Sequence, residues 1–145
     1  MSRIVEMFVV NMLLWREGKI LLLRRKDDNP MWDKCWHFPG GKIEEGEDRF
    51  LALHREVKEE TGVSLACRPE FLETVSYDWK MPDGSIRRCH VHCYRGKTDV
   101  DDISIEEGKA DQYLWADPKE IASLRVLDSM GGILDRWVTN GPPLL

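Results

Sequence analysis

Short apolar runs separated by polar turns open the chain. Residues 7–15 form an apolar run rich in β-branched side chains, a pattern typical of a strand. Glu17 and Gly18 predict a turn, after which the apolar residues 20–23 predict a second, buried strand. The polar segment 24–30 ends in a proline and predicts a loop.

The apolar spacing changes to a helical period in the middle of the chain. Phe50, Leu53 and Val57 recur at intervals of three and four residues, so they share one face of a helix. Gly62 is suited to end that helix, because glycine adopts the left-handed conformation of a helix C-terminus without strain. We therefore predict a helix over residues 50–61.

Strand patterns return in the second half of the chain. Residues 71–79 and 86–95 are strand candidates, and the turn sequence Met81-Pro82-Asp83-Gly84 between them predicts a hairpin. Residues 113–115 predict a further short strand.

Two helices are expected near the end of the sequence. Asp117 as N-cap and Pro118 at the first helical position, with Glu120 two residues on, predict a helix start. A last helix over residues 129–138 buries Ile133, Leu134 and Trp137. The order of strands, one helix, more strands and then helices predicts an α/β fold, in which a mixed sheet carries helices on both faces.

Composition and charge narrow the function classes. The length of 145 residues suits one domain, spanning residues 1–145. The net charge of −5 argues against a nucleic acid polymer as partner, because gripping its backbone needs clustered Lys and Arg. No apolar run approaches the ~20 residues of a membrane span, and no signal peptide is evident at the start. Four cysteines are accordingly expected as reduced thiols in a cytoplasmic protein (Cys35, Cys67, Cys89 and Cys93).

The predicted central helix carries a cluster of acids. Glu56, Glu59 and Glu60 are spaced by three and four residues, so all three project from one side. Carboxylates ~6 Å apart repel by ~3 kcal/mol per pair at an effective dielectric of ~20. Such a cluster is favourable around a hard divalent cation, which prefers oxygen ligands. The alternative is a solvated helix face, which is the usual role of acidic runs.

A glycine pair lies upstream of this helix, in the sequence Phe38-Pro39-Gly40-Gly41-Lys42. Two adjacent glycines let the backbone pass where a side chain would clash, so a carbonyl can reach a metal or an amide can reach a phosphate oxygen. A glycine loop that feeds an acidic helix predicts a cradle for a metal and a diphosphate.

The joint spacing of these features resembles the box of the Nudix hydrolases, G-x5-E-x7-R-E-U-x-E-E-x-G-U with U apolar. Residues 41–63 match it at every fixed position, beginning with Gly41 and Glu47 and continuing with Arg55-Glu56-Val57-Lys58-Glu59-Glu60-Thr61-Gly62-Val63. The resemblance implies the Nudix α/β/α sandwich with a mixed sheet, and a Mg²⁺-dependent hydrolase, with Mn²⁺ as the alternative metal.

The resemblance also implies roles for individual residues. Glu56, Glu59, Glu60 and the carbonyl of Gly40 correspond to metal ligands, and Arg55 to the arginine that holds a catalytic carboxylate. Glu47 corresponds to a structural or outer-sphere acid, and Lys42 is a candidate phosphate contact. A metal-activated water attacks phosphorus in this family. Four acids are candidates for the general base (Glu56, Glu106, Glu107 and Asp111). Of the three that follow the box, Glu107 is included among the predicted catalytic residues.

Several other residues are candidate substrate contacts. Arg24 and Arg25 end a strand that runs toward the substrate cleft in the family pattern, and Arg25 is a candidate substrate contact. Trp32, in a polar loop, is the preferred base-stacking residue, ahead of Trp79 and of Trp36, for which a core role is favoured. Asp128 is a candidate base contact with a helix cap as the alternative.

The segment 89–93, Cys-His-Val-His-Cys, invites comparison with zinc sites. On a strand the two cysteines lie ~13 Å apart, too far to share one ion, so buried thiols alternating with partly exposed histidines are expected instead.

The function that the resemblance favours is MutT-like hydrolysis of a nucleoside triphosphate to the monophosphate and pyrophosphate. ADP-ribose and dinucleoside polyphosphates are the alternative substrates. A non-catalytic nucleotide-sensing module is the alternative class, but all the box carboxylates are present, which favours an enzyme. A monomer or a homodimer is expected.

Overall fold

A computed structural model of the chain describes residues 3–66, 68–127 and 130–139. Its sheet is formed by strands β1 to β7 (β1 Ile4–Arg16, β2 Lys19–Arg25, β3 Trp36–His37, β4 Gly40–Lys42, β5 Glu70–Lys80, β6 Ile86–Lys97 and β7 Ala110–Ala116). The helical elements follow β4 or β7 in the chain (α1 Arg49–Thr61, the 3-10 turn η1 Ile121–Ser123, α2 Gly131–Leu134 and the π-helical turn η3 Asp135–Thr139).

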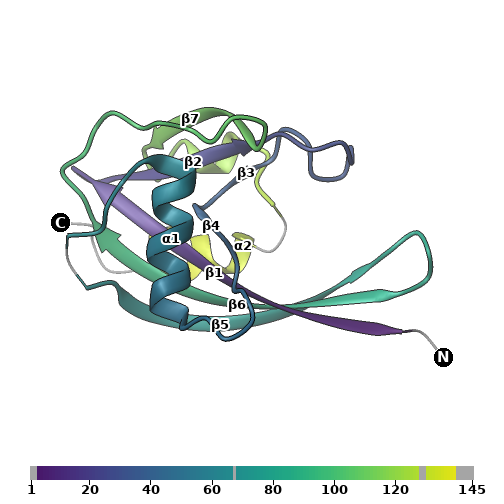
Figure 1. Cartoon of the computed structure of the whole chain (residues 1–145). Helices are drawn as coiled ribbons and strands as arrows, with labels where there is room; N and C mark the ends of the chain where they lie inside the picture. Colours follow the sequence, from purple (N-terminus) through teal and green to yellow (C-terminus); the bar gives the residue numbers. More distant parts are fainter. Residues whose placement is uncertain (1–2, 67, 128–129, 140–145) are drawn as a thin grey trace.

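The sheet is mixed, as expected. Its strand order is β3-β2-β1-β6-β5, with β4 paired to β1 and β7 paired to β2. The pair β1–β6 is parallel and the other strand pairs are antiparallel. A parallel pair needs a long crossover, and the segment carrying α1 lies within the connection from β1 to β6 (Figure 1).

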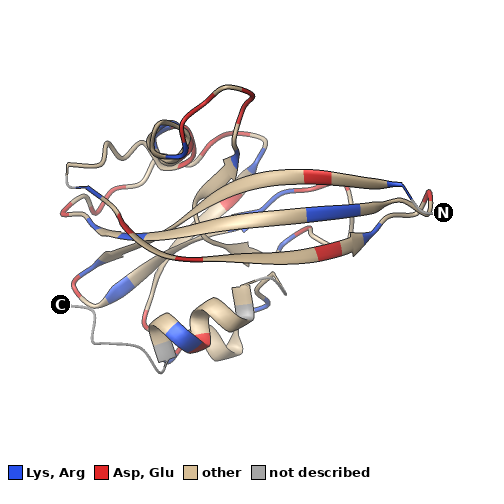
Figure 2. Ribbon diagram, turned by 90° about the horizontal axis from the view of Figure 1, so that it is seen from below, with Lys and Arg blue, Asp and Glu red and all other residues tan. Residues whose placement is uncertain are grey.

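Helices cover both faces of the sheet, so the predicted α/β/α sandwich is confirmed (Figure 2). The core on the α1 side includes Leu53 and Val57, both fully buried, against side chains of β1 and β2. The core on the other side includes Ile133 and Leu134 against β2 and β6. Burying a Leu or Val side chain contributes ~1.5–3 kcal/mol.

The ends of α1 follow from local sequence. Asp48 caps the N-terminus, where its side chain accepts the N–H of Phe50 at 2.8 Å. Gly62 ends the helix at φ 78°, and its N–H donates to the carbonyl of Lys58. The helix thus agrees with the predicted range of 50–61 to within one residue.

The β5–β6 hairpin and the N-terminal half of β1 extend beyond α1 as a long arm (Figure 1). The hairpin turn lies at the predicted place, since the N–H of Gly84 donates to the carbonyl of Met81. We call this part of the sheet the hairpin arm (residues 4–8, 75–80 and 86–90).

Two expected elements near the C-terminus differ in the structure. Asp117 does accept the N–H of Lys119, but residues 118–120 form a turn and continue into the short 3-10 turn η1 in place of the expected α-helix. The reason is long-range pairing, because Arg125 and Leu127 exchange backbone hydrogen bonds with Trp36.

The expected last helix is split between α2 and η3, and its predicted first residue, Ser129, lies outside the described residues. Ile133 and Leu134 are buried as predicted. Trp137 is only partly buried, because its Nε1 donates to Glu73 at 2.8 Å.

Two boundaries near the glycine pair also change. Residues 40–42, expected as a loop, form strand β4, because Val9 and Asn11 of β1 pair with Lys42 and Gly40. Strand β2 continues through Arg25 into the expected loop, since β7 pairs with it as far as that residue.

Candidate active site

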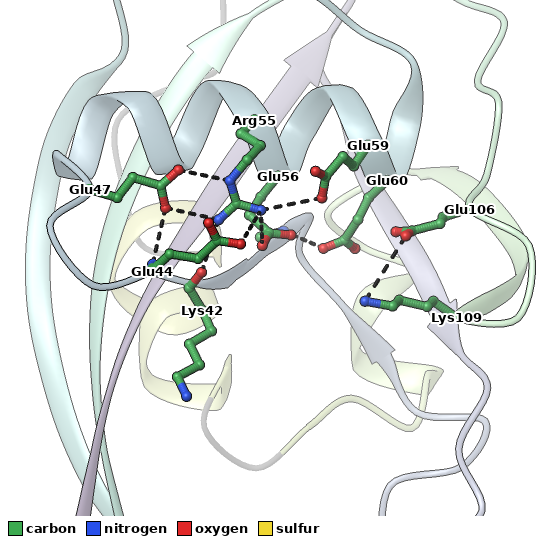
Figure 3. Close-up of polar contacts among 10 residues, drawn as sticks. Lys42, Glu44, Glu47, Arg55, Glu56, Glu59, Glu60, Glu106 and Lys109 are labelled. Atoms are coloured by element: carbon green, nitrogen blue, oxygen red, sulfur yellow. Dashed lines mark hydrogen bonds and ion pairs between the residues drawn. The ribbon is translucent and has the colours of Figure 1, made fainter.

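The acidic side of α1 faces β4 and the loop that precedes β7 (Figure 3). The side chain of Glu56 is 13% exposed and that of Glu59 is 47% exposed, whereas Glu60 is only 9% exposed. The structure therefore brings Glu56 and Glu60 together at the buried part of this surface. Glu59 lies nearer to solvent.

Arg55 lies among these acids and fixes several of them (Figure 3). Its Nε and Nη2 donate to the two carboxylate oxygens of Glu47 at 2.8 and 2.9 Å, a bidentate fork. Its Nη1 donates to Glu56 at 2.9 Å and to Glu59 at 3.3 Å. The guanidinium lowers the pKa of Glu47 to about 2, chiefly through these hydrogen bonds. Arg55 thus positions Glu47 and Glu56 together.

The glycine pair allows β4 to approach the carboxylates closely. A Cβ at Gly41 would lie 2.4 Å from the carboxyl carbon of Glu56, so a side chain there would displace that group. A Cβ at Gly40 would lie 2.0 Å from the carbonyl oxygen of Val10, so a side chain there would displace β1. The N–H of Gly40 instead donates to Oε1 of Glu60 at 3.3 Å.

Glu60 is a buried acid with little positive charge near it. Burial, and next the charge of Glu56, raise the pKa of Glu60 to about 8. Burial also raises the pKa of Glu56, while Arg55 opposes that rise. Within the described part of the chain, Glu60 accepts only the long hydrogen bond from Gly40 and forms no ion pair.

The chemistry of this pair fits a divalent metal ion. Two neighbouring buried carboxylates offer hard oxygen ligands, and a cation would offset both their burial and their repulsion. Among residues 3–66, 68–127 and 130–139, no three Asp, Glu, His or Cys side chains already form a metal-binding group. Other oxygen donors would have to complete the coordination.

A cleft of about 530 Å³ opens beside the carboxylates. It brings together most of the site residues predicted from the sequence (Arg25, Trp32, Gly40, Lys42, Glu56 and Glu60). In Figure 3 the Lys42 side chain points away from the glutamates, so its amine is separated from them. Glu59 and Glu107 do not line the cleft, and Asp128 lies outside the described residues.

An aromatic cluster forms another part of the cleft. Trp32 packs edge-on against Trp79 with ring centroids 5.6 Å apart, and Tyr77 packs edge-on against Trp79 at 5.5 Å. The guanidinium of Arg25 lies 5.7 Å from the ring centroid of Trp32. Trp36 packs against the core instead, as favoured from the sequence.

The loop before β7 places two candidate acids differently. Glu106 contributes to the raised pKa of Glu60, and its Oε1 lies 4.0 Å from Nζ of Lys109 (Figure 3). Glu107 is exposed and does not line the cleft. The geometry therefore favours Glu106 over Glu107 as the loop acid nearest the carboxylates.

Asp111 is engaged elsewhere. Arg24 donates to its two carboxylate oxygens at 2.7 and 2.9 Å, and these hydrogen bonds lower the pKa of Asp111. Neither residue lines the cleft. This pair joins β2 to β7, so its evident contribution is to the sheet.

The cleft residues missed from the sequence include Tyr77, Arg87 and Lys109. The hairpin register places Tyr77 opposite Cys89 and Trp79 opposite Arg87. Side chains alternate along a strand, so Arg87 shares a face with the buried Cys89. That alternation was the available signal for Arg87, whereas Lys109 lies in a loop that carries no such pattern.

The segment 89–93 behaves as predicted from strand geometry. Cys89 and Cys93 are buried free thiols. His90 and His92 are partly exposed and share hydrogen bonds with Ser76 and Thr74, respectively.

Comparisons with known proteins agree with the box. The NUDIX domain family matches residues 6–137. An RNA pyrophosphohydrolase of Caulobacter vibrioides is 36% identical over 87 residues, which are 58% of this chain and 48% of that protein. The chain thus covers about half the length of that relative. A CTP pyrophosphohydrolase of Escherichia coli is 30% identical over 112 residues, 77% of this chain and 76% of that protein.

Among solved structures, a MutT protein from Methanosarcina mazei Go1 has a TM-score of 0.79 at 22% identity, covering 96% of both chains. No helix in the described ranges has the length and apolar character needed to cross a membrane. The resemblance inferred from residues 41–63 is confirmed by the family match over most of the chain, and the protein belongs to the Nudix hydrolase family.

Proposed function

We propose that this protein hydrolyses a nucleoside triphosphate to the nucleoside monophosphate and pyrophosphate in a reaction that needs Mg²⁺. One observation carries the proposal. The buried pair Glu56–Glu60, in which Glu60 forms no ion pair with any described residue, adjoins the Gly40–Gly41 backbone and opens into the same cleft as the aromatic cluster.

Glu56 and Glu60, with Glu59 and the carbonyl of Gly40, would hold the metal. When bound, such an ion neutralises phosphate charge and lowers the pKa of a coordinated water. Mn²⁺ has the same preference for oxygen ligands and is the alternative ion. Arg55 acts as a positioning residue, because it fixes Glu56 and ties it to Glu47.

The reaction adds one water across the anhydride that links the α- and β-phosphates. The water oxygen forms the new bond to phosphorus, the bridging oxygen leaves with the other product, and a carboxylate accepts the proton. We assign that proton to Glu56, which lines the cleft, or to Glu106, whose charge acts on Glu60, since Glu107 is exposed and Asp111 is paired with Arg24. Both candidates lie within electrostatic reach of Glu60.

The rest of the cleft suits the nucleotide. Lys42, Lys109 and Arg25 supply positive charge along the cleft. The edge-on contacts of Trp32 and Tyr77 with Trp79 build an aromatic wall on which a base can stack, a contact worth ~1–3 kcal/mol per base.

A nucleotide panel tests the proposal. The purified protein is incubated with Mg²⁺ and nucleoside triphosphates, ADP-ribose and dinucleoside polyphosphates, and phosphate and pyrophosphate are measured separately. We expect pyrophosphate and monophosphate from triphosphates. Preferential cleavage of ADP-ribose or of a dinucleoside polyphosphate would show that this compound, and not a nucleoside triphosphate, is the substrate. Binding without turnover of any compound would show that the protein is a nucleotide-sensing module and not an enzyme.

A further inference from the structure

The hairpin arm has two outer edges. Its strands lie in the order β1-β6-β5, so β1 and β5 each have one side that faces away from β6 (Figure 2). On that side of β1, the pairing with β4 begins at Val9, and the N–H of Ile43 donates to the carbonyl of Phe8 at 2.8 Å. No described residue pairs with residues 4–7 on the same side. We call this open stretch the β1 edge (residues 4–7).

Backbone groups of the β1 edge are directed outward at alternate residues. The carbonyl of Arg3 accepts a hydrogen bond from β6, whereas the carbonyl of Phe8 accepts one from the opposite side. Because these directions alternate along a strand, the N–H and carbonyl groups of Ile4 and Glu6 point away from β6. They have no backbone partner among the residues that the structure describes. The edge can therefore pair with another strand.

The outer edge of β5 carries features that oppose strand pairing. Charged side chains occur along this strand (Glu70, Glu73, Asp78 and Lys80), and its pairing with β6 shifts between Phe71 and Glu73. Charges and irregular pairing are devices by which natural sheets keep an edge from joining another strand. These features disfavour a partner strand on β5.

The β1 edge lacks these protections. Its pairing with β6 runs without a shift, and Glu6 is its one charged residue. Nε2 of His90 lies 3.2 Å from Oε1 of Glu6, which holds this acid toward β6. The apolar side chains are exposed, at 47% for Ile4, 38% for Val5 and 48% for the adjoining Phe8. A regular, apolar and exposed edge is one that a partner strand is expected to cover.

We propose that the partner is a second copy of this chain, and that two β1 edges pair antiparallel about a two-fold axis at Val5. In this register Ile4 of each copy lies opposite Glu6 of the other, and each such pair exchanges both backbone hydrogen bonds. The two Val5 side chains face each other across the axis. An axis at Glu6 is disfavoured, because it would place Ile4 opposite Phe8, whose carbonyl already accepts the N–H of Ile43. The inference goes beyond the proposed function, since it concerns assembly and not turnover.

Charge complementarity favours a second copy as the occupant. The register places Arg3 opposite Met7 of the second copy, next to the end of its edge at Phe8. The turn that follows Ile43 adjoins that end, and it carries three acids (Glu44, Glu45 and Glu47). Arg3 forms no hydrogen bond or ion pair with any residue in the described ranges, so its charge is available to this acidic turn. The two-fold axis produces the same contact twice.

A cavity of about 340 Å³ adds apolar complementarity at the same place. Val5, Met81 and Pro82 give its apolar lining, and Arg3 lines it too. Residues 3, 5 and 7 share one face of β1 because side chains alternate along a strand. Met7 of the second copy, opposite Arg3, therefore lies beside this apolar lining.

Sedimentation velocity of the whole chain tests the assembly. Samples from ~1 to ~100 μM cover the dissociation constants of weak and moderate dimers. We expect a species of twice the 16.9 kDa monomer mass to increase with concentration. Amide exchange then locates the interface, because the N–H groups of Ile4 and Glu6 should exchange rapidly in dilute protein and be protected in concentrated protein.

Two variants block the edge in different ways. Val5→Lys brings two like charges together at the axis, so it should raise the dissociation constant of the dimer at least ~10-fold. Val100→Lys is its control, because Val100 is similarly exposed at 42% but lies outside the arm. Glu6→Pro removes an outward N–H that β6 does not use, and it should also raise the dissociation constant at least ~10-fold. Glu6→Gln keeps that N–H and should retain the dimer.

Arg3→Glu tests the charge complementarity. It places a like charge beside the acidic turn 44–47, so the dissociation constant should rise ~3- to 10-fold, the scale of two exposed ion pairs. Lys80→Glu, the same reversal on the protected edge of β5, is the control and should have little effect. Equal losses in the two variants would show a general effect of net charge and contradict the proposed pairing.

The remaining outcomes decide the proposal without reference to hydrolysis. A monomer at every concentration overturns it, as does a dimer that neither Val5→Lys nor Glu6→Pro weakens, or one that Val100→Lys weakens equally. Protection of β5 amides in place of those of the β1 edge would assign another interface and also overturn it. Melting curves check that each variant folds, and if Glu6→Pro does not, Val5→Lys decides the matter.

Discussion

The carboxylate end of the cleft and its aromatic end are built in different ways. At the carboxylate end, Gly40, Gly41, Glu56 and Glu60 come from one short stretch of chain, and Arg55 ties the acids together through its hydrogen bonds. At the aromatic end, the groups come from the loop before β3, from β5 and from β6, which are far apart in the sequence.

Because of this difference, the two ends of the cleft should tolerate substitutions to different degrees. At the carboxylate end a Cβ at Gly41 would already meet the carboxyl group of Glu56, so a small change displaces that group. At the aromatic end, the rings of Trp32 and Trp79 meet edge-on, and Arg87 lines the cleft without an ion pair to any residue that the structure describes, so a substitution there displaces no carboxylate. We therefore expect substitutions at the first end to act on rate and those at the second to act on affinity and substrate choice.

The largest effect is expected from Glu60→Gln, which preserves volume and removes one buried charge. We predict a loss of at least ~100-fold in kcat, the scale for removing an electrostatic group at the transition state. The fold should survive, because the change relieves repulsion with Glu56. Glu45→Gln is the control, because Glu45 is an exposed acid in the same box. A near-wild-type rate in Glu60→Gln would show that the acidic cluster is only a solvated helix face.

Two alanine substitutions in the glycine pair should separate rate from stability. In Gly41→Ala the new Cβ meets the end of a flexible side chain, Glu56, so kcat should fall by ~10- to 100-fold, as for a misplacement of ~1 Å. Its thermal stability should change little. In Gly40→Ala the Cβ meets backbone, so the free energy of unfolding should fall by ~1–3 kcal/mol. Melting curves beside rate measurements check both, and the reverse pattern would contradict the proposed packing.

Trp32→Ala tests the aromatic end. If Trp32 stacks on the base, nucleotide affinity should weaken by ~5- to 150-fold, while affinity for pyrophosphate should hardly change. Calorimetry on both ligands distinguishes this from loop support, since equal losses for the two ligands would mean that Trp32 organises the loop through Arg25 and Trp79. If Trp32→Ala loses affinity for neither ligand, Trp32 does not stack on the base and Trp79 becomes the candidate for that role.

The smallest effect is expected at Glu107. Because this acid is exposed and outside the cleft, Glu107→Gln should change kcat by ~twofold or less, as for surface substitutions worth ~0.5 kcal/mol. Glu106→Gln is the informative partner, since loss of a general base costs ~10²- to 10⁴-fold. A large loss in Glu107→Gln would require the loop before β7 to rearrange when substrate binds.

Much of this molecule could be predicted from the sequence where local rules decide. The helix α1 follows from the spacing of Phe50, Leu53 and Val57 and from its end residues, Asp48 and Gly62. The spacing of the acids on that helix and the upstream glycines were enough to recognise the family, because these residues form a single continuous motif.

Long-range pairing decided the features that were missed. Residues 40–42 become a strand only because β1 pairs with them, and the segment after Asp117 is drawn into pairing with Trp36 instead of forming a helix. Tyr77 and Arg87 reach the cleft through the register of β5, β6 and β1. Alternation along β6 indicates which face Arg87 shares with Cys89, but it does not indicate that this face lines the cleft.

The most direct test of the central claim, that Glu56 and Glu60 bind the metal ion on which hydrolysis depends, is the Mg²⁺ dependence of triphosphate hydrolysis. It is measured on the native protein and on Glu60→Gln, with and without excess EDTA. The account predicts that activity requires millimolar Mg²⁺ or Mn²⁺, disappears with EDTA, and shifts to higher metal concentration in Glu60→Gln. Undiminished turnover in excess EDTA, or the same metal dependence in both proteins, would contradict it.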